Sequence, residues 1–150
     1  MFRHLLVTLD GSRSSEAILP YVTDLAKRLN ASVTLVRIVS TAGAVHVNPG
    51  ERGAVGRPRM DAVRRRAETE AHDYLERQAQ TLRRFDIAVS TDVRSGDPAV
   101  EIVSAAQDLR ADTIAMATHS RRGIDRIMLG SVAERVLHLA RVPVILLRAD

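Results

Sequence analysis

The chain has 150 residues, of which 45% are hydrophobic and 27% charged, and its formal net charge is +4. We expect one domain spanning residues 1–150, globular in composition and long enough for a core of its own. The absence of cysteine excludes disulfides and thiolate metal sites and makes a reducing compartment the expected location. No apolar stretch reaches the ~20 residues of a membrane helix, so we expect a cytoplasmic protein with no membrane partner.

The positive charge resides almost wholly on arginine, because Lys27 is the only lysine. The arginine clusters at 64–66 and 83–84 share their segment with acidic residues, as on a solvated helix face. Aromatic residues make up 3% of the chain and offer no platform for stacked bases. These patterns disfavour nucleic acid as a partner.

The first third of the chain predicts a strand, a helix and a second strand. Residues 4–9 (HLLVTL) form an apolar run that is closed by the Asp-Gly-Ser sequence at 10–12. Apolar residues at helical spacing predict a helix over 14–29, which Asn30 ends. The β-branched run at 32–39 predicts the second strand.

The middle of the chain predicts a long loop, a long helix and a third strand. Residues 40–58 are rich in glycine and proline and predict an irregular loop. A charged helix with an apolar stripe is expected over 59–84, followed by a strand over 87–94. The next helix is expected to begin with Asp97 as its cap and Pro98 as its first residue.

The last third predicts a strand over 112–117, a helix over 131–140 and a strand over 142–148, with Pro143 at its start. Strands that alternate with helices predict a parallel sheet with helices on both faces. Ligands of such open sheets bind beyond the carboxyl ends of the strands, where the winding direction reverses. The loops that follow the first and fourth strands are therefore the expected site.

Two interpretations fit the Gly130-Ser131 pair that opens the last helix. Its backbone N–H groups and helix dipole suit an anion, and the Ser131 hydroxyl can donate to a phosphate. Ser131 and Glu134 also fit a capping box that needs no ligand. The preceding turn favours the anion, because it gathers donors and positive charge from Thr118, His119, Ser120, Arg121 and Arg122.

Asp10 also has two interpretations, as the cap of the following helix or as an acceptor for the amino or hydroxyl groups of a ligand. The histidines show no metal-ligand spacing, so we assign no metal site. The chain lacks a phosphate-binding P-loop, a dinucleotide glycine fingerprint and a nucleophile elbow. No nucleophile–base pair is identifiable, and we assign no catalytic residue.

The order of these motifs resembles the universal stress protein family over essentially the whole chain. The resemblance rests on the strand followed by Asp-Gly-Ser, the ATHSRRG turn, the LGSVAE helix start and the closing PVILLR strand. It implies a Rossmann-like (adenine nucleotide alpha hydrolase-like) fold, with an open five-stranded parallel sheet of order 3-2-1-4-5 and helices on both faces. It also implies homodimers joined through the last strand.

Nucleotide-binding members of this family carry the pattern G-x2-G-x9-G-[ST]. Gly130 and Ser131 match its end, whereas Ala117 and Ser120 replace its first two glycines. Each replacement adds a Cβ where the ligand would approach the backbone. By the same resemblance, Asp10 meets the adenine. The predicted nucleotide-binding residues are Thr8, Asp10, Ile38, Ala117, Thr118, His119, Ser120, Arg121, Arg122, Gly130 and Ser131.

We therefore expect a stress-response regulatory module that binds ATP, with Mg²⁺, or a related adenine nucleotide, and hydrolyses it slowly at most. The alternative is a dimeric interaction protein of the same fold that binds no nucleotide. A flavodoxin-like electron carrier is disfavoured by the scarcity of aromatic residues. The apolar strand at 142–148 is expected at a sheet edge, where it pairs with a second copy unless the 40–58 loop covers it.

Overall fold

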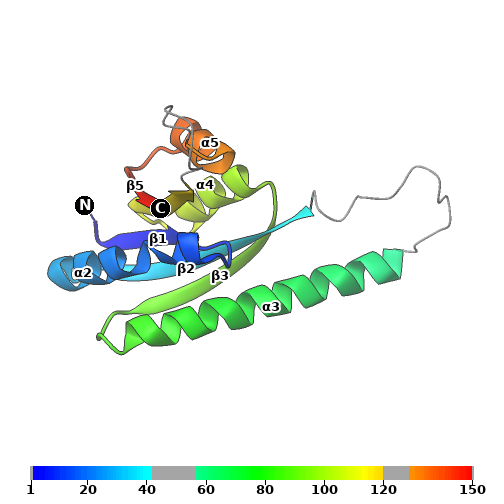
Figure 1. The fold of residues 1–150 in the computed structure, drawn as a ribbon, viewed down its shortest axis with the longest axis horizontal. Coiled ribbons are helices and arrows are strands. Elements are labelled where there is room, and N and C mark those ends of the chain that lie inside the picture. The colour runs from blue at the N-terminus through cyan, green and yellow to red at the C-terminus, as the bar shows by residue number, and fades with distance from the viewer. Residues whose placement is uncertain (1, 42–56, 120–128, 150) are drawn as a thin grey trace.

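The computed structural model describes residues 2–41, 57–119 and 129–149 (Figure 1). Strands and helices alternate along these residues as the sequence predicts. The elements are β1 (His4–Thr8), α1 (Arg13–Glu16), α2 (Leu19–Leu29), β2 (Ser32–Ser40), α3 (Arg57–Arg83), β3 (Val89–Gly96), α4 (Pro98–Asp108), β4 (Thr113–His119), α5 (Ser131–Leu139) and β5 (Val144–Ala149).

The five strands form one parallel sheet in the order β3-β2-β1-β4-β5. This order confirms the predicted Rossmann-like topology. The chain moves from β1 to β2 and β3 on one side of the sheet, and from β4 to β5 on the other. The winding direction therefore reverses between β1 and β4, which lie side by side at the centre.

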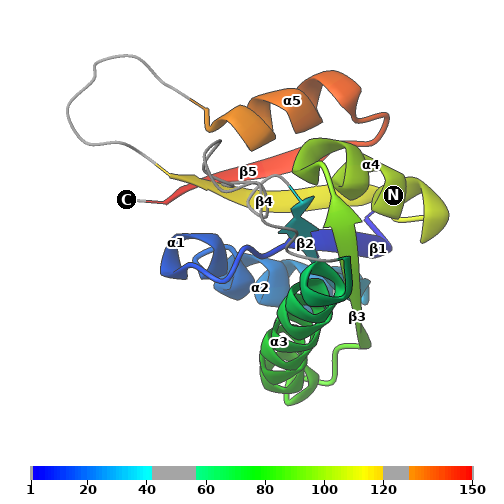
Figure 2. The ribbon, with the colours of Figure 1, turned by 90° about the vertical axis from the view of Figure 1, so that its right-hand side faces the viewer.

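Helices cover both faces of the sheet, as predicted, and each face has its own apolar cluster (Figure 2). Helices α2 and α3 pack on one face, where Leu5 and Val7 of β1 are buried. Helices α4 and α5 pack on the other face, where Leu6 of β1 is buried. Alternate residues of a strand thus enter opposite clusters, as the two-residue period of a strand requires.

The expected helix signals are confirmed at two positions. Asp97 caps α4 by accepting a hydrogen bond from the Val100 N–H, and Pro98 is the first helical residue. Asn30 ends α2 in the left-handed conformation, with φ of 51°. Asparagine tolerates this conformation better than most residues, which makes it a good helix terminator.

The single helix predicted over 14–29 is wrong, because the segment forms the separate helices α1 and α2. The interruption at Ala17–Ile18 lies just before Pro20, the second residue of α2. Proline has no N–H to donate to the carbonyl four residues earlier, which belongs to Glu16. A continuous helical pattern in the apolar residues concealed this break.

Several strand boundaries differ from the prediction by about two residues. Strand β4 runs to His119, so Thr118 and His119 belong to the strand and not to the following turn. They pair with β5 there, as Thr118 lies opposite Arg148. Strand β3 is likewise shifted to Val89–Gly96. Of the predicted 40–58 loop, residues 42–56 lie outside the described part of the chain.

Within residues 2–41, 57–119 and 129–149, no helix is both long enough and apolar enough to be a membrane span.

Candidate functional site

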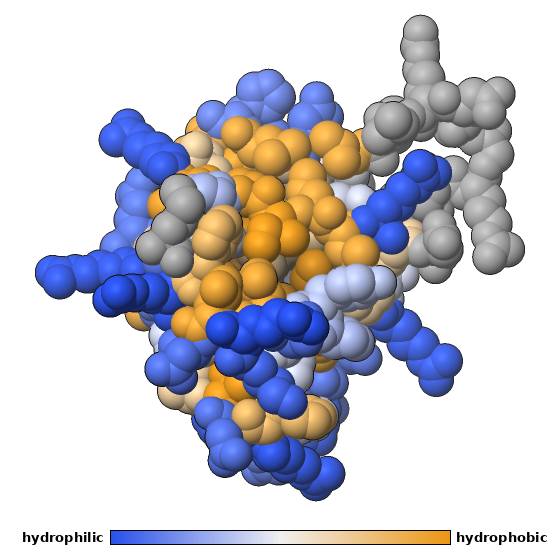
Figure 3. Space-filling view, turned by 90° about the vertical axis from the view of Figure 1, so that its left-hand side faces the viewer, coloured by the Kyte–Doolittle hydropathy of each residue, from blue (hydrophilic) through white to orange (hydrophobic). Residues whose placement is uncertain are grey.

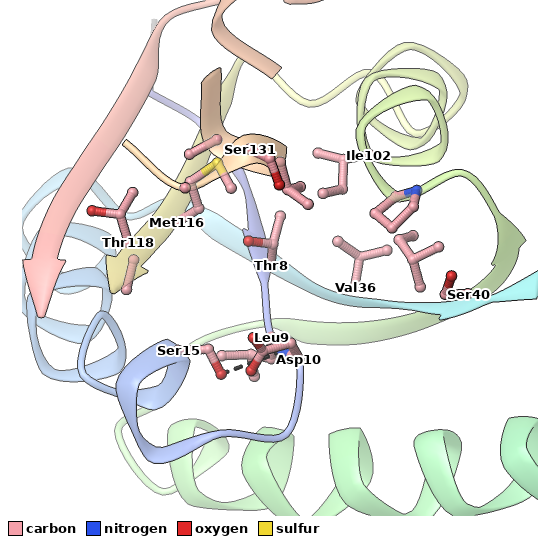
Figure 4. Close-up of a pocket in the computed structure, with 16 residues that line it drawn as sticks. Thr8, Leu9, Asp10, Ser15, Val36, Ser40, Ile102, Met116, Thr118 and Ser131 are labelled. Carbon is pink, nitrogen blue, oxygen red and sulfur yellow. Dashed lines mark hydrogen bonds between the residues drawn. The ribbon is translucent and has the colours of Figure 1, made fainter. Parts of the chain in front are cut away.

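A cavity of about 420 Å³ opens at the carboxyl ends of β1, β2 and β4 (Figure 4). It lies where the winding direction of the sheet reverses, the place at which open α/β sheets bind ligands. In Figure 4, Thr8 lies between Asp10 on one side of the cavity and Ser131 on the other. The volume is within the range of small-molecule sites. We call this cavity the switch-point pocket.

One wall of the switch-point pocket is the loop of residues 10–12, here called the Asp10 loop. The Asp10 carboxylate lines the pocket and its Oδ1 accepts a hydrogen bond from the Ser12 N–H at 2.8 Å. The Asp10 N–H donates to Ser15 Oγ at 3.3 Å. The N-cap of α1 is Ser12, whose Oγ accepts from the Ser15 N–H. Of the two interpretations of Asp10, the cap of the next helix is therefore wrong.

The opposite wall is the start of α5, where no side chain of the described residues forms a cap. Gly130 occupies the N-cap position, and Ser131 is the first helical residue. The capping box suggested for Ser131 and Glu134 is therefore wrong, since that motif needs the serine at the N-cap. The first-turn N–H groups of a helix have no partner within it, and residues 130–133 line the pocket.

The backbone conformation at Gly130 shows whether the fold requires a glycine at this position. Its φ of −56° and ψ of 150° lie in a region open to any residue. No described atom lies within 4 Å of the position that a Cβ would take. The fold of the described residues therefore does not require glycine here, although the position faces the switch-point pocket.

The structure brings together seven of the eleven residues predicted from the sequence. Those that line the pocket are Thr8, Asp10, Ile38, Ala117, Thr118, Gly130 and Ser131. His119 is the last residue of β4, and its side chain is outside the described part of the chain. Ser120, Arg121 and Arg122 also lie outside the described residues.

The sequence reasoning missed other lining residues, although the topology could have identified some. Val36 shares a face of β2 with the predicted Ile38, which the two-residue period implies. Helix α4 covers the same sheet face as α5, so its first turns approach the same strand ends. The missed residues are Leu9, Ser15, Val36, Ser40, Pro98, Ile102, Met116, Val132 and Ala133.

The pocket combines apolar walls with hydroxyl groups. Asp10 is the only ionisable side chain among the described lining residues, and Thr8, Thr118 and Ser131 contribute hydroxyls. Such a surface suits a flat, largely apolar ring that has a few polar edges. The start of α5 adds backbone donors and the positive end of a helix dipole, which suit an anion.

An ion pair braces the two helices that flank the pocket. Arg135 Nη1 of α5 lies 2.7 Å from Asp97 Oδ2 at the start of α4. The hydrogen bond from Arg135, and then the one from the Val100 N–H, hold the pKa of Asp97 below its ordinary value. The start of α4 is thereby linked to the middle of α5.

Within the described residues, no group of three or more histidine, cysteine, aspartate or glutamate side chains could hold a metal ion. The pocket walls themselves offer one carboxylate, that of Asp10.

Comparison with known proteins identifies relatives along the whole chain. The model of the universal stress protein family matches residues 1–148. The universal stress protein MJ0531 of Methanocaldococcus jannaschii is 27% identical over 148 residues, which cover 99% of this chain and 83% of that protein. The universal stress protein YxiE of Bacillus subtilis is 28% identical over 150 residues, covering 99% of this chain and 100% of that protein.

Solved structures share the fold at lower identity. The hypothetical protein MJ0577 superposes with a TM-score of 0.83 at 23% identity, covering 100% of this chain and 98% of that chain. A universal stress protein family protein of Arabidopsis thaliana with AMP bound superposes with a TM-score of 0.66 at 15% identity, covering 98% of this chain and 92% of that chain. A universal stress protein in complex with cAMP superposes with a TM-score of 0.63 at 18% identity, covering 99% of this chain and 98% of that chain. The family model spans nearly every residue, and the chain belongs to the universal stress protein family.

Proposed function

We propose that the chain binds ATP or a related adenine nucleotide in the switch-point pocket and acts as a stress-response regulatory module. The carrying observation is the start of α5, which no described side chain caps and where a glycine that the described fold does not need faces the pocket. Hydrolysis, if any, is expected to be slow, because we assign no catalytic residue.

The phosphates would lie against the start of α5. Backbone N–H groups of Ser131 and Val132, the helix dipole and the Ser131 hydroxyl supply donors for phosphate oxygens. Gly130 would let the phosphates approach the main chain without meeting a side chain. Arg121 and Arg122, close in sequence, would add positive charge. Mg²⁺ would arrive with the triphosphate, since the described residues hold no metal cluster.

The adenine would lie at the other end of the pocket, near the Asp10 loop. The Asp10 carboxylate is an acceptor that suits the ring's amino group or a ribose hydroxyl. Val36 and Ile38 provide an apolar surface for the ring, and Thr8 adds a hydroxyl to the same part of the pocket lining. Two relatives of the same fold are described with AMP and with cAMP, which supports the choice of an adenine nucleotide.

The test begins with the purified protein. Acid extraction followed by chromatography should release an adenine nucleotide, and calorimetry of the stripped protein should give saturable heat with ATP. Protein that carries no nucleotide and gives no heat at millimolar ATP would contradict the proposal. That result would favour the alternative, a dimeric interaction protein that binds no nucleotide.

A second test concerns the two departures from the family pattern. Replacing Ala117 and Ser120 by glycine removes two Cβ atoms from the expected path of the phosphates. The double variant should bind ATP more tightly than the natural chain, and each 1.4 kcal/mol relieved corresponds to about tenfold in affinity. An affinity that stays undetectable in the folded double variant would argue against a weakened nucleotide site.

We also propose that two copies pair along β5. This strand forms one edge of the sheet, and its residues Val144 to Leu147 are only half-buried. Seen from the side on which β5 lies in Figure 1, the molecule has a broad apolar surface (Figure 3). Exposed apolar sheet edges invite pairing with another chain, and pairing with a second copy would bury this one.

A further inference from the structure

A polar contact connects α1, the helix that follows the Asp10 loop, to α3, which lies beyond α1 as seen from the switch-point pocket (Figure 4). The Tyr74 hydroxyl of α3 donates a hydrogen bond to Glu16 Oε1 of α1 at 2.8 Å. Gln78 Nε2 donates to the same oxygen at 3.3 Å. Burial and this hydrogen bond raise the pKa of Tyr74, so its hydroxyl stays protonated and continues to donate.

Helix α1 has only four residues and cannot hold its own conformation, because a single helical turn is unfavourable in isolation. Its position must come from its neighbours. Ser15, beside Glu16, is 5% exposed, donates its Oγ–H to the Ser12 carbonyl and accepts from the Asp10 N–H. A restraint on Glu16 is therefore passed directly to Ser15 and to Asp10.

Arg37 of β2 lies beside both Tyr74 and Gly11 of the Asp10 loop. Its guanidinium lies over the Tyr74 ring, with Cζ 5.0 Å from the ring centroid. Gly11 has a φ of +89°, and a Cβ built on it would come within 3.1 Å of Arg37 Nη2. The guanidinium thus lies over the tyrosine ring and occupies the space beside Gly11 that a side chain there would need.

We propose that Tyr74, Glu16 and Arg37 are positioning residues that hold the Asp10 loop in the conformation that receives the base of the nucleotide. None of the three lines the switch-point pocket, so they would act through the loop and not by touching the ligand. This inference rests on the proposed function. It implies that contacts made by α3, a helix on the sheet face opposite α4 and α5, affect how tightly the pocket binds the base.

The substitution Tyr74→Phe removes the hydroxyl and keeps the ring against Arg37. The matched control is Tyr21→Phe, which removes a hydroxyl from the other tyrosine of the chain, 63% exposed in α2. Two readouts are measured at a temperature at which all variants are folded. These are amide hydrogen exchange at Ser15 and Glu16, and calorimetric affinity for adenosine.

Tyr74→Phe should speed amide exchange at Ser15 and Glu16 at least fivefold and leave exchange in α5 unchanged. It should weaken adenosine binding about tenfold, whereas Tyr21→Phe should alter neither readout. Glu16→Gln keeps an acceptor for the tyrosine and should retain most of the affinity. Glu16→Ala should behave like Tyr74→Phe, and combining the two should add little.

The outcomes separate this inference from the proposed function. A natural chain that binds no adenosine and no ATP would overturn the proposed function, whatever the exchange rates. Unchanged exchange at Ser15 and Glu16 in Tyr74→Phe would overturn the positioning role, even if the nucleotide binds. Faster exchange with unchanged adenosine affinity would also overturn it, since the contact would then hold the loop without serving the ligand.

Discussion

Replacing Gly130 by valine should reduce the affinity for ATP much more than the stability of the fold. The backbone angles at Gly130 suit any residue, and no described atom lies within 4 Å of its Cβ position. The loss of stability should therefore be small, about 0.5–1 kcal/mol, because glycine is moderately preferred over valine at an N-cap. Three added carbon atoms would nevertheless occupy the space in front of the first turn of α5.

A phosphate bound there would accept hydrogen bonds from N–H groups of that turn. Each hydrogen bond to a charged group contributes about 1.5–3 kcal/mol, so losing even one should weaken ATP binding at least tenfold. Ser131→Ala removes a single hydroxyl and should cost about 1 kcal/mol or more. Calorimetry gives the affinities, and denaturant unfolding gives the stabilities.

Gly11→Ala is the matched comparison for stability. Its φ of +89° and the nearby Arg37 guanidinium should make this variant less stable by about 1–2 kcal/mol. The two glycines should thus differ in stability, with Gly11 required by the fold. A Gly130→Val protein that is folded and binds ATP as tightly as the natural chain would refute the assignment of the phosphates to α5.

Three further predictions follow from the described contacts. If two copies pair along β5 as proposed, Leu147→Glu should lower the mass measured by light scattering from that of a dimer to that of a monomer. Val63→Glu, at a position 61% exposed in α3, should leave the dimer mass unchanged. Equal masses for both variants would count against the proposed β5 interface. Arg110 has a φ of 53°, a left-handed conformation that strains a residue with a side chain but not glycine. Arg110→Gly should therefore stabilise the protein by about 0.5–1 kcal/mol in thermal unfolding. A lower melting temperature of this variant would refute the argument from backbone strain. Hydrogen bonds, first the one from Arg135, hold the pKa of Asp97 below its ordinary value of 3.8. Burial opposes ionisation of Asp112, but hydrogen bonds from the Arg3 and His4 N–H groups and from Thr113, together with the charge of the N-terminus, leave its pKa lowered as well. Stability should therefore be lost as the pH falls below about 3.8, and Asp112→Asn should reduce that acid sensitivity in a pH series of unfolding curves.

The sequence predicted most of the fold because local signals and global topology agree. Alternating strands and helices implied a parallel sheet, and the Asp97-Pro98 pair located the start of α4. The strand order came from the family resemblance, since no local pattern specifies which strands are neighbours. The break between α1 and α2 was missed because the apolar period continues across it, although Pro20 is a local signal for a helix start.

The candidate site was predictable only in part, for a physical reason. Motifs directly after strands, such as Asp10 and the Gly130-Ser131 pair, were identified because topology brings the strand ends together. The contact between Glu16 and Tyr74 joins residues 58 positions apart, and nothing in their local sequence pairs them. The capping-box prediction was wrong because the sequence alone does not show whether Ser131 is the N-cap or the first helical residue.

The central claim is that one ligand occupies both ends of the switch-point pocket. The most direct measurement is a titration of ATP into isotope-labelled protein, followed by NMR at the backbone amides of Gly11 in the Asp10 loop and Ser131 in α5. We predict saturable shifts at both amides that fit one dissociation constant, with no comparable shift at Arg110, at the opposite end of the sheet. Shifts at Ser131 and Gly11 that remain absent at millimolar ATP would contradict the account.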